Sequence, residues 1–310
     1  MNIIETQMDV SRFSEKTLSL ALALGAAVWG LYWIPLRTIE GSGITGAWSV
    51  VFFNACPLVV LLPLLPFEYR KLKHIVLPTL LASVLVGLAF TLYSNGLVET
   101  TVVRATLLYY LTPVWSTIIG VLWLSEHLTK ARIIAIVVAF AGLYLLLSDG
   151  ADSTHPLNKG DLYSLLSGIF WAFGIAVLKR WSSIPVLPLA AFIFLCTTML
   201  SAFFAGVVAA EPAPAFSLLR DAFPTALVWS VVVILPGFIV IFRVSQILFP
   251  GRVGILTMSE VVVAIFSASL LLPNEKMAGL QWVGAAAIVA AGLVEVLFGY
   301  SNFKKANRTA

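Results

Sequence analysis

Ten apolar segments, each about as long as a membrane-spanning helix, constrain this 310-residue chain more than any other feature. A helix needs about 20 mainly apolar residues to cross the hydrocarbon core of a bilayer. Lipid offers the backbone no hydrogen-bond partners and the segments are too long for barrel strands, so helices are expected. The segments are residues 18–36, 47–66, 74–97, 102–124, 131–148, 161–179, 186–209, 223–247, 253–272 and 279–299.

The composition agrees with a membrane protein. Sixty per cent of the residues are hydrophobic and 11% are charged, whereas a soluble domain carries about 25% charged residues. A soluble fold of this size has too little interior to bury so much apolar surface. The sequence therefore predicts an all-α integral membrane protein with ten transmembrane helices.

The distribution of basic residues predicts the orientation of these helices. With the N-terminus inside, 14 of the 19 lysines and arginines fall on the cytoplasmic side, as the positive-inside rule requires. Both termini are then cytoplasmic, and a multi-pass protein of a bacterial inner (plasma) membrane is expected. This distribution explains the net charge of +4 without nucleic-acid binding.

The chain contains a duplicated pattern. Residues 104–142 and 252–292 each begin with an arginine, continue through an apolar run to a glutamate, and end a second apolar run in Ala-Gly. Five segments precede and five follow the longest hydrophilic connection, so the second half begins on the opposite side of the membrane. The predicted units are tail 1–17, repeat 18–148, external linker 149–160, repeat 161–299 and tail 300–310. Inverted repeats are typical of secondary transporters.

The string LLYYLTPVWSTIIGVLWLSEHLT resembles the fourth helix of EamA-type members of the drug/metabolite transporter superfamily. The resemblance rests on Pro113 and on the pair Ser125-Glu126, and it extends to the ten-span layout. The second repeat departs from the pattern, with Glu260-Val261 and Asn274-Glu275 at the equivalent positions. Within the family, LLYYLTP is most similar to the aromatic-amino-acid exporter branch. The resemblance implies transport of small metabolites by alternating access without ATP, with export favoured.

Glu260 is the most informative single residue, because an ionisable side chain within a span is costly and usually functional. It lies eight residues after Arg252, about 12 Å along a helix. It is predicted to bind a substrate amine or a coupling proton, and Ser259 is expected to share its cavity. The alternatives are a pair with a neighbouring helix, for example with Arg243, or a carboxyl that stays protonated. Arg243 itself either snorkels to the interface or binds a substrate carboxylate.

Aromatic residues near the middle of several segments are candidates for a cavity wall. A mid-span Tyr or Trp needs a partner for its polar atom, and its ring can stack on a planar ligand or face a cation; core packing is the alternative. Pro113 and Pro236 interrupt their helices and are candidates for gating. The predicted substrate-binding residues are Trp29, Tyr93, Tyr110, Trp171, Ser259 and Glu260.

The predicted function is secondary transport of a small polar or amphipathic metabolite, such as an amino-acid-like zwitterion or an amine. No cofactor or metal is expected, since the chain has no nucleotide-binding loop and no Cys/His cluster. Protons are a possible coupling ion, and both a monomer and a homodimer are compatible with the sequence. The main alternative is a membrane-embedded enzyme acting on a lipid or isoprenoid, although the three histidines lie near segment ends or in connections. A channel is less well supported, because no filter-like loop is present.

Overall fold

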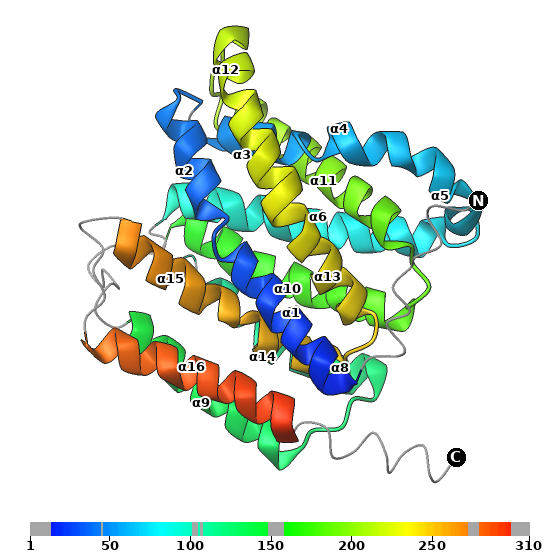
Figure 1. Cartoon of the computed structure of the whole chain (residues 1–310), viewed down its shortest axis with the longest axis vertical. Helices are drawn as coiled ribbons and strands as arrows, with labels where there is room; N and C mark the ends of the chain where they lie inside the picture. The colour runs from blue at the N-terminus through cyan, green and yellow to red at the C-terminus, as the bar shows by residue number, and fades with distance from the viewer. Residues whose placement is uncertain are drawn as a thin grey trace.

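The computed structural model describes residues 14–44, 46–100, 105, 108–147, 158–271 and 279–298. Within these ranges the regular structure is helical, and the helices pack into one bundle (Figure 1). Arg104, Asn274-Glu275, most of the predicted linker 149–160 and most of the two predicted tails lie outside the described residues. The all-α class predicted from the sequence is confirmed.

The helices follow the apolar segments. Seven helical segments of the described chain are long and apolar enough to cross a membrane: Glu15–Gly41, Ala47–Glu68, Val76–Leu97, Lys159–Arg180, Val186–Val208, Phe216–Ser245 and Pro250–Leu271. Two shorter apolar helices cover Thr112–Leu124 and Gly279–Val294, and a further helix covers Lys130–Leu147. In each of the ten apolar segments, helical structure is present among the residues that the structure describes.

Many of these segments are composed of more than one helix. The α-helices are α1 (Glu15–Trp29), α2 (Trp33–Gly41), α3 (Ala47–Ala55), α4 (Leu58–Leu61), α5 (Leu65–Leu72), α6 (Val76–Glu99), α8 (Thr112–Leu124), α9 (Lys130–Leu147), α10 (Lys159–Arg180), α11 (Val186–Phe203), α12 (Phe216–Leu227), α13 (Leu235–Ser245), α14 (Pro250–Thr257), α15 (Ser259–Leu271) and α16 (Gly279–Phe298).

Side-chain caps set the first residue of the first helix in each half. The Ser14 hydroxyl accepts a hydrogen bond from the Thr17 N–H at 3.2 Å and caps α1. Asn158 and Asp161 form a reciprocal capping box at the start of α10, with bonds of 3.1 and 3.0 Å. Such caps satisfy backbone N–H groups that have no partner within the helix.

Two helix breaks occupy equivalent places in the two repeats. Turn residues Tyr110 and Leu111 precede α8, and turn residue Met258 separates α14 from α15. Tyr110 and Met258 are 148 positions apart, the same separation as Arg104 and Arg252. In the first repeat Pro113 lies in the first turn of α8, where its missing N–H costs no hydrogen bond. The second repeat breaks without a proline.

The helix packing is similar when the two halves are exchanged. Helix α6 of the first half packs against α10, the first helix of the second half, and α13 of the second half packs against α1, the first helix of the first half. In the same way α8 packs against α10, and α14 and α15 pack against α1. Glycines allow the close approach of α1 and α13, since a Cβ on Gly25 would lie 3.2 Å from the carbonyl oxygen of Gly237. Helices α9 and α16 pack side by side at one edge of the bundle (Figure 1).

Buried polar contacts link the two halves near the starts of α1 and α14. Arg252 donates to the Glu15 carboxylate at 2.6 Å, with 2% of its side chain exposed. Glu126 pairs with Arg132 and also accepts the backbone N–H of Gly251 at 3.3 Å. Glu126, which follows the end of α8, thus belongs to a buried structural pair.

Candidate functional site

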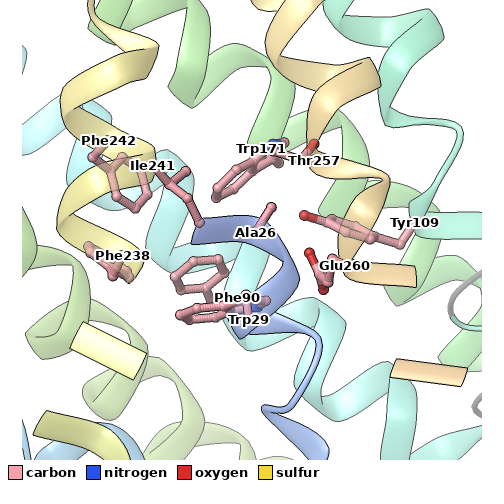
Figure 2. Close-up of a pocket in the computed structure, with 10 residues that line it drawn as sticks. All are labelled: Ala26, Trp29, Phe90, Tyr109, Trp171, Phe238, Ile241, Phe242, Thr257 and Glu260. Carbon is pink, nitrogen blue, oxygen red and sulfur yellow. The ribbon is translucent and has the colours of Figure 1, made fainter. Parts of the chain in front are cut away.

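A narrow cavity lies where α1, α6, α10 and α13 meet the two helix breaks near Tyr109 and Met258 (Figure 2). Both halves of the chain contribute to its wall. The lining residues are Ala26, Trp29, Phe90, Tyr109, Trp171, Phe238, Ile241, Phe242, Thr257 and Glu260.

Five aromatic rings form a closed circuit in this wall. Consecutive ring centroids are 5.0 Å apart from Trp29 to Phe90, 5.6 Å to Trp171, 5.7 Å to Phe242, 4.3 Å to Phe238 and 5.9 Å back to Trp29. These are separations at which aromatic pairs attract each other. Packing of each ring on two others restricts its rotation, so the wall is a pre-formed apolar surface.

The polar groups gather on the side opposite Phe238 and Phe242. Figure 2 shows Tyr109, Thr257 and Glu260 together on that side. Glu260 lies in the first turn of α15, directly after the Met258 break, and only 8% of the residue is exposed. The break therefore places a carboxyl group beside the apolar wall.

The surroundings of Glu260 contain hydroxyl groups. The Tyr110 side chain interacts with the Glu260 carboxyl, although its buried hydroxyl forms no hydrogen bond of standard geometry. The rings of Tyr93 and Tyr110 pack against Tyr109, with centroids 4.5 and 4.9 Å away. Within the described residues Glu260 forms no ion pair. A buried carboxylate without a counter-charge is costly, so a proton or a bound cation is needed to neutralise it.

Arg243 is not the partner of Glu260. Its guanidinium donates to the side-chain oxygen of Gln246 at 2.9 Å, at the end of α13. Gln246 in turn donates to the carbonyl oxygen of Ile184 at 2.6 Å. The possible Arg243–Glu260 pair considered from the sequence is therefore absent.

The structure brings together only part of the predicted binding set. Trp29, Trp171 and Glu260 line the cavity. Tyr93 and Tyr110 are not among the lining residues, and their rings pack against Tyr109, which is. The Ser259 hydroxyl is engaged elsewhere, because it donates to the carbonyl oxygen of Ala23 at 2.7 Å and so ties α15 to α1.

The two prolines occupy different surroundings. Pro113 is buried at the start of α8, beside the break that precedes the helix. Pro236 is exposed and follows a π-helical segment, Val228–Ile234, at the start of α13. π-helical turns are frequent at functional sites. Each proline is thus close to an irregular part of its helix.

The binding set predicted from the sequence omitted seven of the ten lining residues, namely Ala26, Phe90, Tyr109, Phe238, Ile241, Phe242 and Thr257. A partial signal existed in α13, where Phe238 and Phe242 are four residues apart and therefore share one helix face. Phe90 gave no signal, because a phenylalanine in an apolar helix usually contacts lipid or core.

The cavity is small in this conformation. The centre of a water molecule can move over only about 10 Å³ within it, which is on the order of one water. A metabolite the size of an amino acid does not fit unless the helices move apart. Among the described residues no group of three or more His, Cys, Asp or Glu side chains is placed to hold a metal.

Comparison with known proteins finds relatives both in sequence and in fold. Two curated relatives are uncharacterized transporters: YojE of Bacillus subtilis (strain 168), 27% identical over 134 residues, and a protein of Archaeoglobus fulgidus, 26% identical over 160 residues. These matches cover 40% and 52% of this chain, and 44% and 55% of the relatives, so the chain spans about half the length of each. A solved crystal structure superposes over 96% of this chain and 99% of its own, with a TM-score of 0.68 and 18% identity.

The family comparison covers both halves of the chain. The model of the EamA-like transporter family matches residues 17–148 and 158–296, which together are most of the chain. The resemblance seen around Pro113 in the sequence is therefore confirmed. This chain belongs to the EamA-like transporter family, within the drug/metabolite transporter superfamily.

Proposed function

We propose that this transporter is a secondary active carrier that moves a small polar or amphipathic metabolite bearing an amine through the cavity by alternating access. One observation carries the proposal. Glu260 is buried beside a helix break, on the wall of a cavity shared by both halves, and it has no ion-pair partner among the described residues. Intramembrane ionisable residues of this kind usually mark a transport pathway.

Alternating access requires that the halves move relative to one another. The cavity is nearly filled by its own side chains in this conformation, so binding and release need an opening motion. The helix breaks at Tyr110 and Met258, together with Pro113 and Pro236, supply positions where backbone angles can change without disrupting a complete helix. We assign these positions to gating.

Glu260 is also the proposed coupling residue. A proton and a substrate ammonium group can each neutralise its carboxylate. A proton-coupled carrier follows if the two bind alternately. Export is the proposed direction, which the family resemblance supports. Amines and amino-acid-like zwitterions are the substrate classes to be compared first.

The proposed architecture has ten spans in two inverted five-helix repeats, in a bacterial inner membrane with both termini cytoplasmic. The exchangeable packing of the two halves and the equivalent breaks at Tyr110 and Met258 support the repeats. A terminal tag tests the orientation. Protection of tags at both ends from protease added outside spheroplasts is expected, and cleavage of either tag contradicts this topology.

Counterflow in liposomes tests the transport proposal. The purified protein is reconstituted, and labelled amines and amino acids are screened with and without a proton gradient. Counterflow of one compound that the gradient stimulates would support a proton-coupled carrier, and counterflow indifferent to the gradient would remove proton coupling. Absence of counterflow for every compound would reject amine transport and favour the enzyme alternative.

A further inference from the structure

The cavity carries an unbalanced charge. Among its lining residues in the described chain, Glu260 is acidic and none is basic. The remaining polar groups are the hydroxyls of Tyr109 and Thr257 and the indole nitrogens of two tryptophans. A substrate carboxylate buried here would lack a cationic partner and would face the like charge of Glu260, and both conditions are costly.

Three basic side chains of the neighbouring helices are held elsewhere. Arg252 on α14 pairs with Glu15 at 2.6 Å, and Arg243 on α13 donates to Gln246 at 2.9 Å. Lys179 on α10 donates to the carbonyl oxygen of Ile247, and its ammonium group lies 4.5 Å from the centre of the Phe249 ring. Each cation therefore already has a partner outside the cavity wall.

One of the two helix ends at the break adds to the negative character of the site. The N-terminus of a broken helix can bind a substrate carboxylate, but the first turn of α15 already carries Glu260. The preceding helix, α14, ends at Thr257, which lines the cavity. A helix C-terminus carries partial negative charge, so this end also favours a cation.

The aromatic circuit suits the same ligand. The faces of tryptophan and phenylalanine rings attract cations and pack against apolar bodies. Trp29, Phe90 and Trp171 belong to the wall that also contains Glu260, and Phe90 is stacked on both tryptophans.

We propose that the cavity selects monovalent organic cations, namely amines with an apolar or aromatic body, and rejects zwitterions and anions that share this body. The ammonium group lies against Glu260 with the hydroxyls of Tyr109 and Thr257 nearby, and the body lies against the aromatic circuit. This inference rests on the site assigned under the proposed function and narrows its substrate class.

A series of matched probes tests the charge preference without any mutation. Phenethylamine, phenylalanine and 3-phenylpropionate share a phenyl ring and carry a cation, a zwitterion and an anion, respectively. Binding to the purified wild-type protein is measured by titration calorimetry at neutral pH. We expect phenethylamine to bind at least about tenfold more tightly than the other two. Equal or tighter binding of phenylalanine, or absence of binding by phenethylamine, would overturn the inference.

Two variants assign the preference to one residue. In Glu260→Gln the affinity for phenethylamine should fall by at least about tenfold, whereas the weak affinity for the neutral analogue phenethyl alcohol should not change. Glu40→Gln is the matched control, because Glu40 pairs with Arg37 on α2 and does not line the cavity. An unchanged affinity for phenethylamine in a folded Glu260→Gln protein would contradict the assignment.

Binding and transport distinguish this inference from the proposed function. Transport of phenylalanine in preference to the amine overturns the cation preference and leaves the carrier intact. Tight binding of phenethylamine without counterflow in liposomes supports the cation site and contradicts its transport.

Discussion

Glu126 accepts a hydrogen bond from the backbone N–H of Gly251 at 3.3 Å, across 125 positions of the chain. The same carboxylate pairs with Arg132, and both side chains are almost fully buried, at 2% and 5% exposure. The end of α8 and the start of α14, which belong to different repeats, are thereby fixed to each other. This contact lies in the scaffold that holds the helix breaks in place.

Replacement of Glu126 by glutamine should therefore destabilise the protein strongly. The change removes the carboxylate that pairs with buried Arg132, and breaking a buried ion pair typically costs about 3–5 kcal/mol. Thermal unfolding in one detergent measures the effect. The exposed pair of Arg37 and Glu40 serves as a control, since Glu40→Gln should change stability by about 1 kcal/mol or less. A comparable midpoint for the two variants would show that the buried pair contributes little.

Substitution of Glu260 by glutamine should abolish transport, or at least its stimulation by a proton gradient, and leave the protein folded. The amide keeps the size of the carboxyl group but can neither release a proton nor attract an ammonium group. Counterflow at several pH values, with the elution profile of the purified variant as a folding control, provides the measurement. Wild-type rates with unchanged pH dependence would exclude Glu260 from coupling.

Trp171→Ala should weaken the apparent affinity for substrate by roughly 3- to 10-fold, because an aromatic contact of this kind is worth about 1 kcal/mol. Trp171 lines the cavity and packs on Phe90 and Phe242. The matched variant is Trp123→Ala, since Trp123 is 43% exposed on α8 and does not line the cavity. The concentration dependence of uptake gives the apparent substrate affinity of each variant. Equal affinities in the two variants would mean that Trp171 serves only in packing.

Gly168→Ala should reduce transport, because α10 packs closely against the break before α8. A Cβ at this position would lie 2.7 Å from the Tyr109 carbonyl oxygen and 2.8 Å from the Thr112 hydroxyl. The resulting shift displaces Tyr109 and costs about 1–3 kcal/mol. At Gly292 no atom lies within 4 Å of an added Cβ, so Gly292→Ala should be neutral or slightly stabilising. Transport rates and thermal unfolding midpoints are measured for both variants. Equal values for Gly168→Ala and Gly292→Ala would contradict the prediction.

Ala26→Leu should block the cavity, at an overpacking cost of about 1–3 kcal/mol. Ala26 is buried on α1 and lines a space that holds on the order of one water, so added methyl groups compete directly with substrate. The matched substitution is Ala286→Leu on the exposed side of α16, which should leave uptake unchanged. Normal uptake by a folded Ala26→Leu protein would place the transport path elsewhere.

The sequence by itself determined the medium and the helical class, because these follow from local quantities. Apolar length defines a span, and the recurring frame that begins at Arg104 and Arg252 predicts a duplication. The break before α8 was also predictable, since Pro113 restricts the backbone locally. Glu260 stood out for the same reason, because a carboxyl group within an apolar run is conspicuous in any arrangement of helices.

Only the tertiary structure decided which side chains share the cavity. Whether Phe90 faces lipid or Trp29 depends on how α6 rotates against α1 and α10, and an apolar side chain is compatible with either environment. The engagement of Ser259 with Ala23 and of Arg243 with Gln246 depends on distances between segments far apart in the chain. No glycine or proline stands next to Met258 to predict the break in the helix there. Packing against the first half of the chain therefore decides where the helix breaks.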